Sequence, residues 1–441
     1  MEDRRGGPRA RSQRDVWSRL PRGLAAFRYR NYRLFWFGQL ISVTGTWMQS
    51  LAQSWLVLSL TTSAFLLGLV SVFQFAPVLL IGLFAGVLVD RVRKRNLLVV
   101  TQSLSAVLAG LLAVLTWTDR IELWMVYAIA FCLGTVNAFD MPTRQAFVVE
   151  MVGKDDLMNA IALNSSLFNA ARIIGAAVAG VLLAAVGPAA AFGINAFSYL
   201  AVIAGLLMMK LGPHVAVARG RGLQQMREGL RYVRSTESIL RPILLVGLVA
   251  TFGMNFNVWI PLLAKQDLNS GAGGFGLLMA ASGVGSLIGA LALAFLVTSV
   301  KRWMLFTTAA ALGALDIALA IVGAIPLAIG VAMLVLAAIG FCSTTTMAMA
   351  NTTVQTAAPD ELRGRVMSVY TTVFAGTAPF GALIAGAISN RFGTPASLLV
   401  GGLITMTAVA AVAFWGRLGS GTPAVETRAV TSQGHERGTQ G

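Results

Sequence analysis

The chain has 441 residues, of which 56% are hydrophobic and 12% are charged, and its mean hydropathy is +0.74. A soluble domain averages about 25% charged residues, so this composition excludes an ordinary soluble domain and indicates a chain that folds largely in lipid. The formal net charge of +16 does not indicate a nucleic-acid partner, because the cations lie in short loops between apolar runs and form no continuous basic face.

Residues 1–33 are rich in arginine and lack the compact apolar segment of a signal peptide, so we interpret them as a disordered basic tail. Twelve apolar runs follow, each long enough to cross a bilayer as a helix. They lie at about 34–59, 64–89, 96–117, 123–145, 158–186, 189–211, 240–263, 273–299, 303–323, 326–350, 364–389 and 395–416. The sequence therefore predicts an all-α integral membrane protein.

The longest break between these runs, 212–239, divides the twelve spans into two sets of six. Apolar residues recur within it at helical spacing opposite its arginines, which predicts an amphipathic helix at the inner membrane surface. We predict a six-helix bundle at 34–211, a linker at 212–239, a second six-helix bundle at 240–416 and a disordered cytoplasmic tail at 417–441.

Short repeats relate the two predicted bundles. Phe131-Cys132 recurs as Phe341-Cys342, and the pair Gly175 and Gly180 recurs as Gly381 and Gly386 with the same spacing. These glycines are candidates for close helix packing. A parallel repeat of six helices suits a transporter whose site lies between the two bundles.

Nearly all of the 34 Lys and Arg residues fall in the two tails, the linker and alternate loops, which share one side of the membrane. The loops on the other side hold only Arg120, Lys265 and Arg391. This positive-inside pattern predicts a multi-pass protein of the bacterial cytoplasmic membrane with both termini in the cytoplasm.

Metal sites and enzyme chemistry find little support in the sequence. Cys132 and Cys342 lie in apolar spans, and the two histidines are isolated, which disfavours a metal site. The sequence has no Walker motif and no plausible catalytic triad. We expect no enzyme activity, no cofactor, and a monomer in the lipid bilayer.

The second span ends in Gly86-x3-Asp90-Arg91-x-Arg93-Lys94-Arg95. This segment resembles the loop motif of the major facilitator superfamily, GxxxDRxGR(R/K), with Arg93 where the second glycine usually stands. In that family the Asp lies near the start of the eleventh helix. The resemblance implies that Asp90 latches the two bundles together on the cytoplasmic side, with Arg91, Arg95 and Arg363 nearby. The alternative is that these cations only anchor the topology.

The segment from Ala138 to Gly180 resembles the drug and siderophore exporter branch of that superfamily, which contains enterobactin and macrolide exporters. The resemblance implies export of a small-molecule substrate in exchange for protons by alternating access, driven by the proton gradient. Two departures keep alternatives open: Ala176 replaces a proline after Gly175, and Thr46 replaces an acid of the first helix. The alternatives are an uncoupled or importing carrier of a metabolite, and a non-transporting sensor on the same scaffold.

Few ionisable residues lie deep inside the predicted spans, where charge is costly and usually functional. Asp316 is either a proton-coupling residue or a protonated acid buried between helices. Arg172 either takes part in transport, for example by binding an anionic substrate, or braces its helix. Asp140 and Arg144 are either a cytoplasmic gate pair or local structure at a helix end.

Polar side chains also mark the helices that line the central cavity in the superfamily. The candidates are Gln49, Gln53, Asn137, Asn255 and Asn257. Aromatic residues accompany them at Trp47, Trp55, Phe139, Phe256 and Trp259. A cavity lined by amides and aromatic rings suits bulky amphipathic substrates. The alternative is that the amides bridge helices and the tryptophans lie at the lipid interface.

Overall fold

The computed structural model describes residues 22–89, 92–153, 156–210, 222–297, 300–323, 325 and 329–418. Every regular element within these ranges is helical. Helices suit long apolar runs because a helix satisfies its own main-chain hydrogen bonds, which lipid cannot do. The predicted all-α membrane fold is confirmed.

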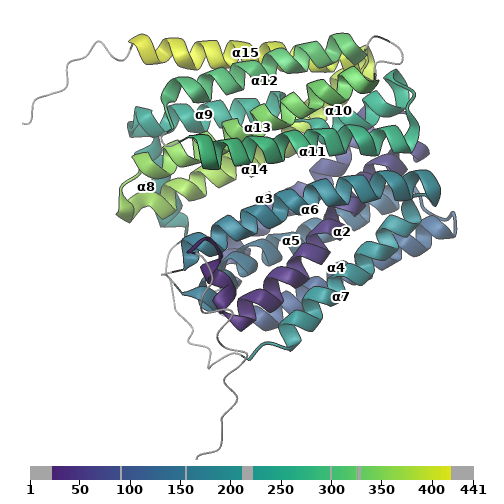
Figure 1. Ribbon diagram of the computed structural model, residues 1–441, viewed down its shortest axis with the longest axis horizontal. Helices are drawn as coiled ribbons and strands as arrows, with labels where there is room; N and C mark the ends of the chain where they lie inside the picture. Colours follow the sequence, from purple (N-terminus) through teal and green to yellow (C-terminus); the bar gives the residue numbers. More distant parts are fainter. Residues whose placement is uncertain are drawn as a thin grey trace, which may run out of the picture.

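The first half of the chain forms one set of helices, which lies in the lower part of Figure 1. Its elements are the short 3₁₀ helix η1 (Arg22–Arg28), α2 (Arg30–Leu60), α3 (Ala64–Val89), α4 (Lys94–Trp117), α5 (Leu123–Val152), α6 (Leu157–Ala185) and α7 (Pro188–Leu207). Within this set α2 packs on α6 and α7, α3 packs on α5, and α4 packs on α5 and α7.

The second half forms a similar set in the upper part of Figure 1. Its elements are α9 (Glu237–Phe252), α10 (Phe256–Leu262), the π-helical turn η2 (Leu263–Asp267), α11 (Gly271–Leu296), α12 (Arg302–Gly323), α13 (Ile329–Ala357), α14 (Asp360–Phe392) and α15 (Thr394–Leu418). Here α11 packs on α13, α12 packs on α13 and α15, and α14 packs on α9 and α15. The two sets meet where α3 contacts α14 and α6 contacts α11.

Eleven stretches within the described residues are long and apolar enough to cross a membrane. The twelfth span is α2, whose 31 residues exceed the length that a bilayer needs. Its hydropathy is lower because it carries Gln39, Gln49 and Gln53, all buried among the neighbouring helices. The polar side chains of α2 therefore face the neighbouring helices rather than lipid.

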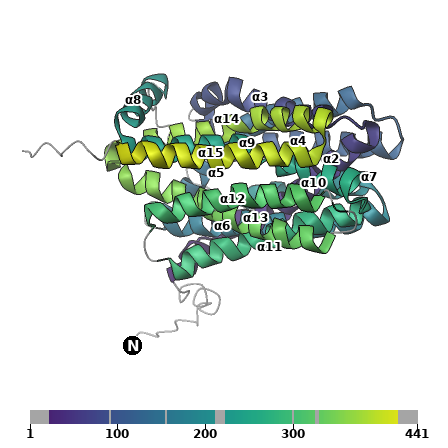
Figure 2. The ribbon, with the colours of Figure 1, turned by 90° about the horizontal axis from the view of Figure 1, so that it is seen from above.

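Successive spans run in opposite directions, so the turns gather at two ends. One end carries α8 (Gly222–Ser235), the starts of α2 and α14, and many cations, and we call it the basic end. The turns 61–63, 186–187 and 268–270 lie at the opposite end. Figure 2 shows α8 standing off the basic end, where Arg365 of α14 donates a 2.6 Å hydrogen bond to Glu228 of α8.

Two expectations about the helices are corrected. Residues 22–33 do not belong to a disordered tail, because η1 and the start of α2 are ordered against α6. The main-chain N–H of Ala26 donates to Asn159 at 2.8 Å, and the buried Tyr32 hydroxyl donates to the carbonyl of Ala160 at 3.0 Å. The high arginine content of this segment led us to predict disorder, although its other residues pack against α6.

The seventh span is not one continuous helix, since α9 ends at Phe252 and α10 begins at Phe256. The side-chain amide of Asn255 donates to the carbonyl of Thr251 at 2.7 Å. In an unbroken helix that carbonyl would accept the main-chain N–H of the same residue. This local competition, next to the flexible Gly253, accounts for the break.

Candidate functional site

Three hydrogen bonds between described residues join the two helix sets at the opposite end of the molecule. The Lys265 ammonium donates to the carbonyl of Leu58, and the Gln266 amide donates to the carbonyl of Thr62 at 3.2 Å. Ser63 donates to the side chain of Asn390 at 2.9 Å.

Glycines bring the helices into close contact at the same end. A Cβ placed on Gly180 of α6 would lie 2.6 Å from the Cα of Gly276 of α11. A Cβ on Gly386 of α14 would lie 2.7 Å from the carbonyl oxygen of Ala64 of α3. Since only glycine permits these approaches, the sequence itself allows the two sets to close here.

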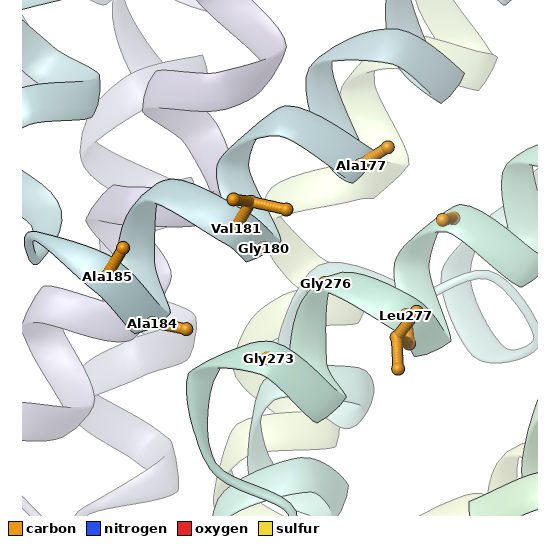
Figure 3. A pocket seen from close by; sticks show the side chains of 9 residues that line it. Ala177, Gly180, Val181, Ala184, Ala185, Gly273, Gly276 and Leu277 are labelled. Atoms are coloured by element: carbon orange, nitrogen blue, oxygen red, sulfur yellow. The ribbon is translucent and has the colours of Figure 1, made fainter.

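A pocket of about 590 Å³ lies beside the Gly180–Gly276 contact, as Figure 3 shows. Its lining consists only of glycine, alanine, valine and leucine residues from α6 and α11. It has no polar group that would orient a ligand. Val181 and Leu277 in its lining are exposed, as expected for a groove that faces lipid. We do not place the substrate site there.

One face of α6 changes from exposed to buried along its length. Ile161, Ser165 and Phe168 recur at helical spacing near the basic end, and all three are exposed. The same face continues through Ala176, Ala179 and Leu183, which are buried against protein. The space between the helix sets is therefore closed at the opposite end and open towards the basic end.

Helix α14 shows the same change on the other side of that space. Ser368 and Thr371 are exposed, whereas Ala382 and Ala385 on the continuation of this face are buried. The Gly180–Gly276 contact of α6 with α11 and the Gly386–Ala64 contact of α14 with α3 both lie in the closed part. The described residues show a single conformation that is open at the basic end.

Arg172 lies on this face of α6, between its exposed and its buried part. Its Nη2 donates to the side-chain oxygen of Asn169 at 3.0 Å, and the guanidinium carbon lies 6.0 Å from the ring centre of Trp47 in α2. Gly175 lets α6 approach this tryptophan, since a Cβ there would lie 2.7 Å from the Trp47 Cβ. The predicted candidates Arg172 and Gly175 thus belong to one cluster with Trp47.

Asp140 and Arg144 form an ion pair on α5, buried within the first helix set. The Asp140 carboxylate also accepts hydrogen bonds from Thr101 at 2.7 Å and from Gln102 at 2.8 Å, both on α4. Arg144 in turn donates to Gln39 of α2. These contacts fasten α2, α4 and α5 together, and the proposed gating role of the pair stays a prediction.

The predicted polar cavity residues occupy different places. Gln49 is buried and accepts a 2.7 Å hydrogen bond from Asn195, and Gln53 is buried with no acceptor for its amide nitrogen among the described residues. Asn137 and Asn257 are exposed, and Asn255 is committed to the break between α9 and α10. The structure does not gather these five amides into one cluster.

Asp316 of α12 is completely buried, and neither carboxyl oxygen has a hydrogen-bond partner in the described part of the chain. Thr405 of α15 is buried nearby, also without a partner for its hydroxyl. A Cβ on Gly253 would lie 2.7 Å from Thr405 Oγ1 and 3.4 Å from Asp316 Oδ2. The carboxyl group therefore faces the break between α9 and α10.

The predicted latch falls partly outside the described residues, which leave out Asp90 and Arg91. Gly86 lies near the end of α3, and Arg95 of α4 donates to the carbonyl of Leu207 at 3.3 Å. Arg363 of α14 donates to the carbonyl of Gln355 at 3.0 Å. Gly381, the remaining predicted packing glycine, approaches the carbonyl oxygen of Thr251, to which a Cβ would lie at 2.4 Å.

Some partners of the candidate residues were missed from the sequence. Thr101, Gln102 and Gln39 surround the Asp140–Arg144 pair, and Thr405 lies near Asp316. The available signal was a polar side chain in an otherwise apolar span, which in lipid needs a protein partner. That signal marks the residue without naming the helix against which it packs.

Comparisons with known proteins agree with this fold. The staphyloferrin A transporter of Staphylococcus aureus is 25% identical over 85% of this chain and 93% of its own length. The multidrug efflux pump Tap of Mycolicibacterium fortuitum is 27% identical, covering 83% and 91%. The macrolide efflux protein A of Streptococcus pyogenes is 25% identical, covering 86% and 95%.

Solved structures show the same fold at low sequence identity. A bacterial homolog of the human lysosomal transporter Spinster, in an inward-facing and occupied conformation, has a TM-score of 0.68 at 14% identity, covering 88% of this chain and 97% of that chain. The nucleoside transporter NupG has a TM-score of 0.67 at 12% identity, covering 92% and 100%. A family model described as a transmembrane secretion effector matches residues 22–435. This chain therefore belongs to the transmembrane secretion effector family of the major facilitator superfamily, and it is a multi-pass membrane transporter of small molecules rather than an enzyme.

Proposed function

We propose that this transporter exports drug-like or siderophore-like amphipathic molecules from the bacterial cytoplasm in exchange for protons. The observation that carries the proposal is the match over most of the chain to two relatives named as efflux proteins, for multiple drugs and for macrolides. The concentration of cations at the basic end supports an orientation with that end, and both termini, in the cytoplasm.

Alternating access is the proposed mechanism. The space between the helix sets is open at the basic end and closed at the opposite end, where glycine contacts and three hydrogen bonds hold the sets together. In the proposed cycle, substrate enters from the cytoplasm, these contacts part, and the Asp90 latch closes the basic end. Both sets come from one chain, so we propose that the monomer is the working unit.

We assign the proton to Asp316. A charged carboxylate in its place would have no counter-ion among the described residues, so the neutral acid is the less costly form. Asp140 suits this role less because Arg144, Thr101 and Gln102 already stabilise its charged form. Asp316 faces the α9–α10 break, so movement of that break would change the surroundings of the carboxyl group.

The proton gradient is sufficient for the proposed work. One elementary charge crossing about 100 mV releases about 2.3 kcal/mol. A tenfold concentration ratio corresponds to about 1.4 kcal/mol. One proton per cycle would therefore sustain accumulation of a neutral substrate by some tens-fold through the membrane potential alone.

Accumulation assays in a bacterial host without its own major efflux pumps test the proposal. Cells that express the chain should retain less radiolabelled erythromycin or ethidium than cells with an empty vector, and a protonophore should abolish the difference. The Asp316→Asn substitution keeps the size of the side chain. Cells that express this variant should retain as much compound as cells with the empty vector. Equal retention with and without well-expressed wild-type protein would refute export of these compounds. Reduced retention that the protonophore does not change would indicate an uncoupled carrier.

A further inference from the structure

Arg172 has no anionic partner among the residues that the structure describes. It lies about 22 Å along α6 at 1.5 Å per residue, near the middle of this 29-residue helix. Within the described residues no carboxylate lies within ion-pair distance of its guanidinium group, and its buried Nε has no hydrogen-bond acceptor. An unpaired cation at this depth is costly, so a partner is expected at some stage of the cycle.

Two other arginines within the helices form ion pairs with carboxylates. Arg144 pairs with Asp140. Arg241 of α9 stacks over Trp415 at 5.8 Å, much as Arg172 stacks over Trp47, yet it also pairs with Glu237 one helical turn away. In the described part of the chain, Arg172 has the aromatic contact but no carboxylate partner.

The surroundings of Arg172 position its guanidinium group without neutralising its charge. Its hydrogen-bond acceptor, Asn169, belongs to the same helix, so that bond joins no two helices. The guanidinium group also lies over the Trp47 ring of α2, where cation–π attraction offsets part of the desolvation cost. A guanidinium group carries five N–H donors, and two of them can bind both oxygens of one carboxylate.

We infer that Arg172, positioned by Trp47, binds the carboxylate of an amphipathic anionic substrate, which rests on the proposed export function. Arg172 lies where the face of α6 changes from exposed to buried, at the closed limit of the open space. Phe168 and Ile161 extend the same face towards the basic end and are exposed. A carboxylate on Arg172 would leave the apolar body of the substrate against these two side chains.

Equilibrium binding to the purified full-length chain in lipid nanodiscs tests this inference. The probes are 1-pyrenebutyrate, its neutral methyl ester and the cation 1-pyrenebutylamine, which share one fluorescent apolar body. Fluorescence anisotropy gives each Kd. The wild-type chain should bind the carboxylate at least about tenfold more tightly than the ester, as hydrogen bonds between charged groups generally give.

Three variants locate the preference. Arg172→Gln should remove the carboxylate preference and leave the Kd for the ester within about twofold of wild type. Arg172→Lys keeps the charge but loses the paired N–H geometry, so it should keep part of the preference. Arg302→Gln is the matched control, because Arg302 lies over the ring of Phe306 at 5.6 Å and is exposed at the basic end. It should bind all three probes as wild type does.

Three results would overturn the inference. The first is a wild-type chain that does not prefer the carboxylate, and the second is an Arg172→Gln variant that keeps the preference. The third is an Arg172→Gln variant that also loses affinity for the ester and melts at a lower temperature, which would make Arg172 a structural residue. Because binding requires no proton gradient, an Arg172-dependent preference supports the inference even if the export assay fails.

Discussion

The contact between Gly180 and Gly276 predicts that one methyl group will change which end of the transporter is open. A Cβ on Gly276 would lie 2.1 Å from the Cα of Gly180, whereas ordinary contacts between such carbons are 3.4–4 Å. The two helices must therefore separate by about 1.5 Å, and overpacking of this kind costs about 1–3 kcal/mol. In a conformation open at the opposite end the helices have already parted, so Gly276→Ala costs little there.

The equilibrium between the two conformations should accordingly shift about 5- to 150-fold towards the one open at the opposite end. Ala179 reports on the change because it is completely buried on the face of α6 that would become exposed. We would introduce Ala179→Cys after replacing Cys132 and Cys342 by alanine. A membrane-impermeant maleimide added outside intact cells should then label Cys at this position faster in the Gly276→Ala variant.

Gly193→Ala in α7 is the matched control, because a Cβ there would meet no atom within 4 Å. It should not change the labelling rate. An unchanged rate in a well-folded Gly276→Ala protein would refute the reasoning. So would a fall in melting temperature without faster labelling, because the methyl group would then weaken the fold rather than shift the conformation.

Three further predictions concern the charged candidates. Asp316→Asn should leave the melting temperature close to that of the wild type, because the amide has the size of the neutral carboxyl group that it replaces. It should abolish the dependence of efflux on pH, and retained pH dependence would contradict the proton-carrying role of Asp316. Arg144→Met should lower the free energy of unfolding by about 3–5 kcal/mol, because the buried Asp140 carboxylate loses its counter-ion. An unchanged free energy of unfolding would refute the importance of the pair. Asp90→Asn should stop efflux at equal expression through loss of the latch, whereas wild-type efflux would eliminate the latch hypothesis.

The spans could be predicted closely because each depends on a local property of the sequence. An apolar run must be a helix in lipid, and its length is set by the bilayer. The predicted second span, 64–89, has the same limits as α3, and the third differs from α4 only at its first residues. The amphipathic pattern of the linker likewise predicted α8.

Features that depend on which hydrogen-bond partner a single side chain has could not be predicted in this way. The break after Phe252 arises because the Asn255 side chain takes the carbonyl that its own N–H would use. The same amide could instead have pointed into a cavity. Its position in the sequence does not show which of these two arrangements occurs. Asn137 and Asn257, which look equivalent in the sequence, are exposed instead.

The individual residues of the candidate site could be predicted from the sequence, but their grouping in space could not. Arg172 stands out in the sequence as a cation within an apolar span, but its neighbour Trp47 belongs to the first span. The sequence also gives no sign that Arg172 lacks a carboxylate while Arg144 has one, since both depend on helix packing. The exposure change along α6 is a property of one conformation, which the sequence does not specify.

Proton release from everted membrane vesicles tests the central claim of proton-coupled export most directly. Vesicles that contain the chain would be made acidic inside, and a ΔpH-sensitive fluorophore would be followed as macrolides, dyes and siderophores are added one at a time. The account predicts proton release with at least one compound, absent from vesicles without the chain and from vesicles with Asp316→Asn. Accumulation of such a compound in wild-type vesicles without any proton release would contradict the account.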